Sequence, residues 1–128
     1  MFRLARRRLS LFIPMVGHDI IVIGASAGGV QILQQLVGGL PERFAASLFV
    51  VVHTSSSSLG LISQIIGRDS KLKVEYAVNE QPIAHGKIYV APPDHHLLVR
   101  QGKVELGRGP RENGFRPAAD PLFRSAAQ

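Results

Sequence analysis

Two residues of this chain, Ser26 and His53, are of the types that carry out nucleophilic catalysis. Ser26 lies in the segment Gly24-Ala25-Ser26-Ala27-Gly28, which has the Gly-x-Ser-x-Gly pattern of a nucleophile elbow. A serine hydroxyl is a weak nucleophile until a base removes its proton, and a histidine within hydrogen-bond reach is the usual base. The pair therefore predicts acyl transfer, provided that the fold brings the two side chains together.

The segments before these two residues are typical of buried parallel strands. Ser26 follows an apolar run at residues 20–23, and His53 follows another at residues 48–52. Continuous runs of Ile and Val are found in strands that are covered on both faces, and parallel neighbours end at the same edge of a sheet. That carboxyl edge is also where open α/β sheets bind their ligands. We therefore expect Ser26 and His53 to meet there.

The same glycine-rich turn at the start of a helix also suits a phosphate group. A dinucleotide-binding unit would carry glycine at position 26 and an acidic residue near the end of the second strand, to hold the ribose. This chain has Ser26 and His53 at those places, which favours catalysis. A phosphate- or nucleotide-binding α/β module remains an alternative, as does a non-catalytic remnant.

The remaining apolar segments alternate between helical and strand spacing, which predicts an α/β fold with a doubly wound, mostly parallel, Rossmann-like sheet. A turn at Gln101-Gly102 predicts a β-hairpin inserted near residues 87–106. The sheet is expected to be incomplete, with an exposed edge and one uncovered face. The expected helices are at residues 30–37, 59–66 and from 118 onward, and the further strands are at 73–78, 87–91, 96–100 and 103–106.

Composition excludes several classes of function. The chain of 128 residues has no cysteine, which rules out disulfides, thiolate metal sites and a cysteine nucleophile. Its net charge is +6, but four arginines among the first eight residues supply most of it, so no basic stripe for nucleic acid is expected. No apolar run approaches the roughly 20 residues of a membrane span. Residues 1–18 are expected to be a basic leader without regular structure, and the protein is expected in the cytoplasm.

Four segments carry a resemblance to known proteins: Gly24-Ala25-Ser26-Ala27-Gly28-Gly29, Val51-Val52-His53, Gly86-Lys87-Ile88-Tyr89-Val90-Ala91-Pro92-Pro93 with His96-Leu97, and Arg116-Pro117-Ala118-Ala119-Asp120-Pro121-Leu122-Phe123-Arg124-Ser125-Ala126-Ala127. In this order they resemble the catalytic domain of bacterial chemotaxis protein-glutamate methylesterases, the CheB type. One glycine-serine motif would be weak, whereas four segments in register are specific. The resemblance spans residues 19–128, as the N-terminal part of such a domain.

The resemblance implies hydrolysis of glutamate methyl esters on the cytoplasmic helices of methylated chemoreceptors, and related members also deamidate receptor glutamines. It assigns the nucleophile to Ser26 and the general base to His53. The backbone N–H of Ala27 would help to stabilise the oxyanion. Neither a metal nor an organic cofactor is implied, and the partners do not include nucleic acid or an inserted membrane segment.

The family's third catalytic residue is an aspartate in a Gly-Met-Gly-x-Asp-Gly type segment, downstream of the part that resembles residues 116–127. Asp69, Asp94 and Asp120 do not stand in such a segment, so the resemblance gives the role to none of them. We therefore expect a chain truncated at its C-terminus, with impaired activity, since a mutated triad acid costs about 10⁴ in kcat.

Two other groups invite functional interpretations. His95 and His96 are adjacent, and adjacent side chains on a strand point to opposite faces, so a shared metal ion is not expected. Arg108, Arg111 and Arg116 form a basic loop, for which solvated charges are the first interpretation and contact with an acidic receptor helix the second.

Overall fold

The computed structural model describes residues 2–7, 18–53 and 61–128. The elements in chain order are β1 (Phe2–Arg7), β2 (His18–Ser26), the short 3-10 helix η2 (Ala27–Gly29), α1 (Val30–Gly38), β3 (Ser47–His53), α3 (Ile62–Gly67), β4 (Lys73–Tyr76), β5 (Lys87–Val90), β6 (His96–Arg100), β7 (Lys103–Gly107) and α4 (Ala119–Ala126). Within the described residues they build a five-stranded sheet in the order β1-β2-β3-β5-β4 and a separate hairpin of β6 and β7.

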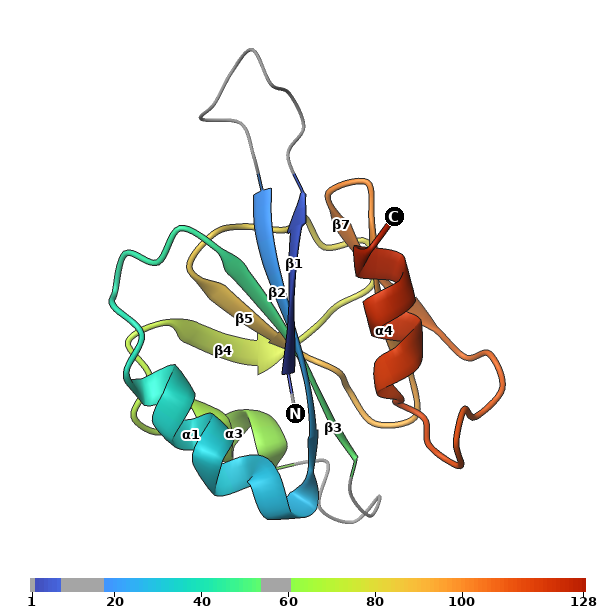
Figure 1. The fold of residues 1–128 in the computed structure, drawn as a ribbon, viewed down its shortest axis with the longest axis horizontal. Helices are drawn as coiled ribbons and strands as arrows, with labels where there is room; N and C mark the ends of the chain where they lie inside the picture. The colour runs from blue at the N-terminus through green and yellow to red at the C-terminus, as the bar shows by residue number, and fades with distance from the viewer. Residues whose placement is uncertain (1, 8–17, 54–60) are drawn as a thin grey trace.

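The strands β2, β3, β5 and β4 run parallel, with a crossover between each pair that is consecutive in the chain. Helices lie on both sides of this sheet: α1 and α3 are at the left of Figure 1, and α4 is at the right. The prediction of a doubly wound, mostly parallel α/β fold is confirmed.

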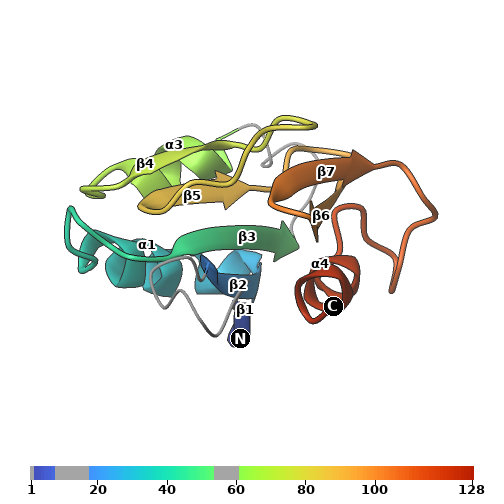
Figure 2. The same ribbon diagram turned by 90° about the horizontal axis from the view of Figure 1, so that it is seen from above.

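The two faces of the sheet are buried in two separate clusters, as the alternation of side chains along a strand requires. In β3, Leu48, Val50 and Val52 pack with α1 and α3, whereas Phe49 and Val51 face α4 and the hairpin. Figure 2 shows α4, β6 and β7 together on the side opposite α1 and α3. The expectation of an uncovered face is therefore wrong for the described residues, because the hairpin and α4 cover it.

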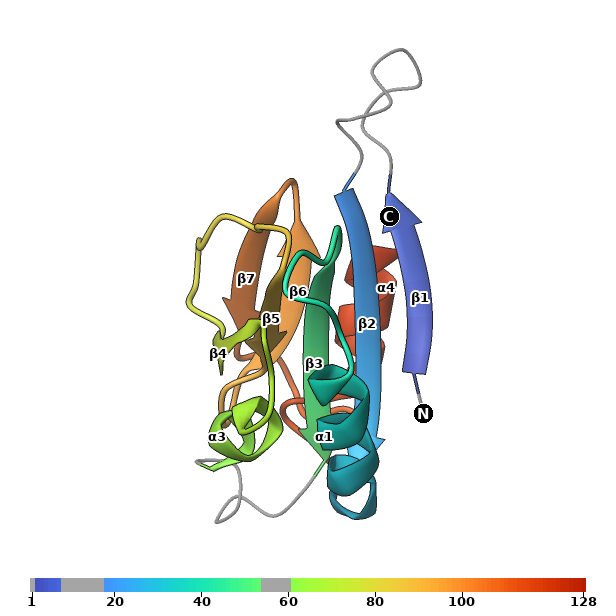
Figure 3. The ribbon, with the colours of Figure 1, turned by 90° about the vertical axis from the view of Figure 1, so that its left-hand side faces the viewer.

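The first residues also differ from the expectation. Phe2–Arg7 form β1, which pairs antiparallel with β2 from Phe2 opposite Ile23 to Arg7 opposite His18, and Figure 3 shows β1 beside β2 at one edge of the sheet. The outer edge of a strand carries unpaired N–H and C=O groups, and an extended segment that satisfies them can join the sheet there. Of the predicted unstructured leader, residues 1 and 8–17 lie outside the described residues.

The hairpin is shorter than the predicted insertion. Lys87–Val90 belong to the main sheet, as β5, and the antiparallel pairing runs from His96 opposite Gly107 to Arg100 opposite Lys103. Two backbone hydrogen bonds join the hairpin to the segment after β4. The N–H of Glu80 donates to the carbonyl of Val104 over 2.9 Å, and the N–H of Val104 donates to the carbonyl of Gln81 over 2.8 Å.

Tyr89 anchors the contact between β3 and β5. Its ring is fully buried and stacks on Phe49, with centroids 4.8 Å apart and planes 17° from parallel. Its hydroxyl donates to the carbonyl of Pro82 over 3.2 Å and accepts from the N–H of Ala84 over 2.8 Å. The loop before β5 is thereby fixed to the core.

In the described part of the chain, no helix has the length and apolar character needed to cross a membrane.

Candidate active site

Ser26 and His53 are register partners in the parallel pair β2 and β3, and each is the last residue of its strand. Neighbouring strands lie about 4.8 Å apart. By the alternation along each strand, both side chains belong to the face covered by α4, the face of Val22 and Val51. The structure therefore brings together the two residues that the sequence singled out.

The backbone around Ser26 leaves its hydroxyl free of helix capping. Ser26 has an extended conformation, with φ −88° and ψ 170°, and its side chain makes no capping hydrogen bond to η2. A Cβ added at Gly28 would lie 3.9 Å from the Ser26 Oγ, an ordinary contact distance. Ala27 opens η2, and the first N–H groups of a helix have no acceptor inside it. Ser26 and Ala27 are exposed among the described residues, which leaves the hydroxyl and the adjacent N–H group accessible there.

His53 is held by contacts from a distant part of the chain. The backbone N–H of Ala119, at the start of α4, donates to Nε2 of His53 over 3.1 Å. The imidazole also stacks on the ring of Phe115. The hydrogen bond described for His53 thus joins it to Ala119 and not to Ser26.

The surroundings of His53 favour its neutral form. Partial burial lowers the pKa of His53 below its usual range, and the nearby negative charge of Asp120 works in the opposite direction. Burial is the larger effect because removing a charged ring from water is costly. A neutral imidazole carries the lone pair that a general base needs.

The three aspartates that the sequence left unassigned make their hydrogen bonds elsewhere. Asp69 accepts from Gln34, and Asp120 accepts from Asn113, each over 3.4 Å. Asp94 binds arginines, as described below. Asp120 reaches His53 through its charge rather than through a hydrogen bond.

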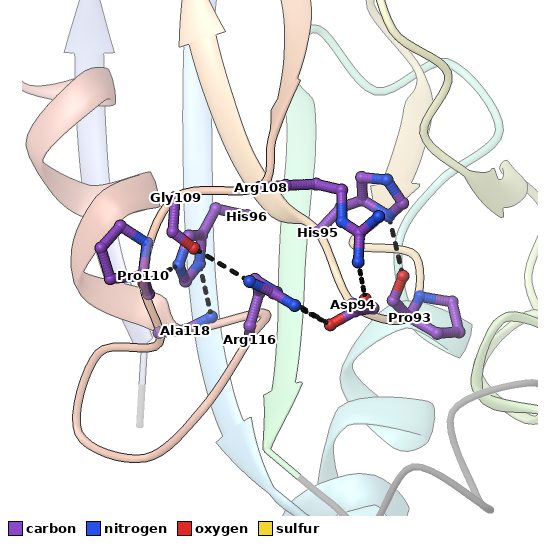
Figure 4. A network of polar contacts seen from close by, with 9 residues as sticks. All are labelled: Pro93, Asp94, His95, His96, Arg108, Gly109, Pro110, Arg116 and Ala118. Atoms are coloured by element: carbon purple, nitrogen blue, oxygen red, sulfur yellow. Dashed lines mark hydrogen bonds and ion pairs between the residues drawn. The ribbon is translucent and has the colours of Figure 1, made fainter.

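Asp94 joins two arginines of the loop between β7 and α4 (Figure 4). Its Oδ2 lies 2.6 Å from Nη2 of Arg108, and its Oδ1 lies 2.8 Å from Nε and 2.6 Å from Nη2 of Arg116. The hydrogen bond from Arg116 is the main cause that lowers the pKa of Asp94. Arg116 also donates to the carbonyl of Gly109. Asp94 thus gives both arginines an ion-pair partner within the chain, which favours a structural role for them over contact with an acidic partner.

The adjacent histidines have separate structural partners, also drawn in Figure 4. Nε2 of His96 lies 2.7 Å from the carbonyl of Pro110, and its Nδ1 accepts from the N–H of Ala118 over 3.3 Å. Nδ1 of His95 lies 2.8 Å from the carbonyl of Pro93. His96, which is 4% exposed, ties the start of α4 to the hairpin. No group of potential metal ligands occurs among the described residues.

Sequence reasoning missed the two residues that hold His53. Ala119 acts through its backbone, so its side chain carries no signal. Phe115 lies in a glycine- and proline-rich loop, and nothing in that pattern indicates which ring it meets.

Comparison with known proteins gives the same family from sequence and from structure. The sequence model of the CheB methylesterase family matches residues 21–128. A protein-glutamate methylesterase/protein-glutamine glutaminase of Anaeromyxobacter dehalogenans is 34% identical over 110 residues, which cover 86% of this chain and 32% of the relative. The protein-glutamate methylesterase FrzG of Myxococcus xanthus is 33% identical over 116 residues, covering 90% and 35%.

Among solved structures, the crystal structure of the Thermotoga maritima CheB methylesterase catalytic domain superposes with a TM-score of 0.79 at 32% identity. The match covers 86% of this chain and 60% of that domain. A relative from Leptospira interrogans is 33% identical, and the chain spans 59% of its length. The chain thus spans between about a third and three fifths of these proteins. From the matched residues 21–128 and the superposed fold, this chain belongs to the CheB methylesterase family.

Proposed function

We propose that this chain carries the nucleophile and base of a protein-glutamate methylesterase, which hydrolyses glutamate methyl esters on the cytoplasmic helices of chemoreceptors. The observation that carries the proposal is the in-register placement of Ser26 and His53 at the ends of neighbouring parallel strands. The activities in the names of the relatives, glutamate methylesterase and glutamine glutaminase, support it. Both would take place in the cytoplasm.

The first half of the reaction forms a covalent intermediate. His53 accepts the proton of the Ser26 hydroxyl while Oγ attacks the ester carbonyl carbon. The negative charge that develops on the carbonyl oxygen is stabilised by the N–H of Ala27. Collapse of this tetrahedral species breaks the bond to the methoxy oxygen, which takes the proton from His53 and leaves as methanol. The glutamyl group stays bonded to Oγ of Ser26.

The second half returns the enzyme to its starting state. His53 removes a proton from water, the hydroxide attacks the carbonyl of the glutamyl-Ser26 ester, and the bond to Oγ breaks. Ser26 recovers its proton from His53, and the glutamate side chain is released. An amide substrate follows the same path with ammonia as the leaving group. All groups used are those of the chain, the substrate and water.

The third catalytic role stays unassigned within residues 1–128. Asp69, Asp94 and Asp120 have other hydrogen-bond partners, and we assign the role of triad acid to none of them. We therefore propose that these residues alone hydrolyse the ester slowly, since a mutated triad acid costs about 10⁴ in kcat.

An alkyl fluorophosphonate, which reacts with activated serines, tests the proposal on the 128-residue chain. We expect the probe to label Ser26, as located by mass spectrometry, and Ser26→Ala to abolish the label. His53→Gln should slow labelling by about 10²- to 10⁴-fold, the usual contribution of a general base. Ser63→Ala, the same change in α3, serves as the control and should label normally.

A second assay measures methanol released from a peptide that contains glutamate γ-methyl ester, with Ser26→Ala as the blank. Labelling that persists in Ser26→Ala would rule out this nucleophile. Absence of labelling, together with a rise in melting temperature on addition of inorganic phosphate or a nucleotide, would favour the phosphate-binding alternative.

A further inference from the structure

His53, the base of the proposed reaction, has one ring-nitrogen lone pair in its neutral form. In the structure that lone pair already accepts a hydrogen bond. A neutral imidazole has one ring nitrogen that donates and one that accepts. The N–H of Ala119 donates to Nε2 of His53 over 3.1 Å, so Nε2 is the acceptor. The proton of the neutral ring must therefore be on Nδ1.

The contact forms because the start of α4 lacks a local cap. Ala118 precedes the helix and offers no side-chain hydrogen bond to it, while the first N–H groups of a helix need acceptors from outside. Two histidine rings supply them: Nδ1 of His96 accepts from Ala118, and Nε2 of His53 accepts from Ala119. The last residue of β3 thus caps a helix that begins 66 positions later in the chain.

The helix is held firmly in this position. Leu122 is fully buried against the sheet. The hydroxyl of Ser125 accepts from the N–H of Val99 and donates to the carbonyl of Leu122, each over 2.9 Å. The N–H of Ala119 is therefore presented to His53 by a packed element.

We propose that the N–H of Ala119 competes with the hydroxyl of Ser26 for the single lone pair of neutral His53, so that the start of α4 holds the base in an inactive state. This inference rests on the proposed function. Hydrolysis then requires the Ala119 contact to open before His53 can take the proton from Ser26.

The competition holds whichever nitrogen Ser26 approaches. At Nε2 the hydroxyl meets a nitrogen that already accepts from Ala119. At Nδ1 it meets a nitrogen that carries the proton and cannot accept. The other tautomer would place a proton on Nε2, directly against the N–H of Ala119. Two donors would then face each other, and no hydrogen bond could form between them.

The contact also weakens His53 as a base. A hydrogen bond to the neutral form of a group disfavours its charged form, and the N-terminal end of a helix disfavours a cation nearby. Both act in the same direction as the burial of the ring, against the charge of Asp120 in the first turn of α4. Opening of the contact is therefore expected to free the lone pair and to raise the pKa of His53.

The substitution Ala119→Pro removes this donor while keeping the helix. Proline is favoured at the first helical position, where its missing N–H costs no helical hydrogen bond. The residue before a proline must be extended, and Ala118 already has φ −123° and ψ 154°. Ala119→Ser retains the N–H and is the matched control. Far-UV circular dichroism checks that both variants fold.

Two measurements test the proposal. Nitrogen-15 spectra of the imidazole should show the proton on Nδ1 in the unsubstituted protein, with a scalar coupling across the hydrogen bond between the Ala119 nitrogen and Nε2. In Ala119→Pro the pKa of His53 should rise. The rate of fluorophosphonate labelling at Ser26 should then increase by about fivefold over Ala119→Ser, the effect of one ordinary hydrogen bond.

A proton found on Nε2 in the unsubstituted protein overturns the competition, and this result does not depend on whether any variant folds. Labelling of Ala119→Pro at the rate of Ala119→Ser or more slowly also overturns it. Absence of Ser26 labelling in every variant overturns the proposed function instead, and the tautomer still reports separately on the helix cap.

Discussion

The imidazole of His53 and the ring of Phe115 lie face to face, with centroids 4.4 Å apart and planes 8° from parallel. One ring ends a central strand and the other belongs to the loop before α4. Phe115 is 38% exposed, so it shields one face of the imidazole while remaining at the surface. A surface residue therefore sets part of the environment of a proposed catalytic base.

Phe115→Ala should raise the pKa of His53 toward its usual value, because water reaches the ring that the phenyl group covers. The stacking itself contributes about 0.5–1.5 kcal/mol, so only a modest loss of stability is expected. Titration of His53 by NMR measures the effect, and Phe115→Tyr, which keeps the stacking, is the control. An unchanged pKa in Phe115→Ala would show that the remaining neighbours bury the ring.

Glu75→Gln should make the free energy of unfolding vary less with pH in the acid range. Lys87 Nζ lies 2.6 Å from the Glu75 carboxylate, and Gln81 donates to it over 2.9 Å. These contacts lower the pKa of Glu75 to about 2, and the hydrogen bond with Lys87 has the largest effect. Because the folded-state pKa is lowered, the stabilisation is complete above the unfolded value of about 4.3 and is lost as the pH falls toward 2.

We expect Glu75→Gln to lower the free energy of unfolding by about 0.5–1 kcal/mol at pH 7, since the site is partly exposed to solvent. The difference from the unsubstituted protein should shrink below about pH 4.3. Thermal unfolding at a series of pH values measures it, with the exposed Glu42→Gln as the control. A difference that stays constant down to pH 3 would contradict the assignment.

Asp94→Asn should loosen the loop between β7 and α4. Asp94 has a φ of +62°, a conformation that asparagine tolerates well, so the backbone is expected to keep its shape. The substitution removes the charge that holds Arg108 and Arg116. Amide hydrogen exchange of residues 107–117 should become faster. The control is Glu80→Gln, which alters the longer contact of Glu80 with Lys103 at 3.8 Å. It should leave the exchange of residues 107–117 unchanged. Equal exchange in both variants would mean that the arginines do not order this loop.

Ser125→Ala should destabilise the docking of α4. The N–H of Val99 would lose its acceptor in a buried position, because Ser125 is 5% exposed. An unsatisfied buried donor costs about 1–3 kcal/mol. Urea unfolding measures this loss, and Ser63→Ala should stay within about 0.5 kcal/mol of the unsubstituted protein. A loss no larger than that of the control would indicate that water replaces the hydroxyl.

The sequence was sufficient to predict the positions of Ser26 and His53. Long Ile and Val runs admit few interpretations, and a run that ends at a chemically active residue places it at the edge of a parallel sheet. The hairpin turn at Gln101-Gly102 was equally local, and both residues have a positive φ in the structure. These features are encoded within a few residues of where they appear.

What the sequence did not reveal depends on contacts between distant segments. β1 joins the sheet through backbone hydrogen bonds to β2, which leave no trace in residue type. A strand at residues 87–91 was predicted, but the insertion of the observed β5 between β3 and β4 follows from the topology of the whole sheet. The contacts of His53 with Ala119 and Phe115 likewise arise only once α4 has packed.

The burial of Tyr89 against Phe49 also affects the ultraviolet spectra of this protein. The chain has no tryptophan and two tyrosines, so tyrosine dominates its near-ultraviolet absorption and its emission. Tyr89, on β5, is fully buried and stacks on Phe49 of β3, whereas Tyr76, on β4, is only partly buried. The near-ultraviolet circular dichroism band therefore reports on side-chain packing at the centre of the sheet, and its loss while far-ultraviolet signal remains would identify a loosened core. The protein carries its own optical probe.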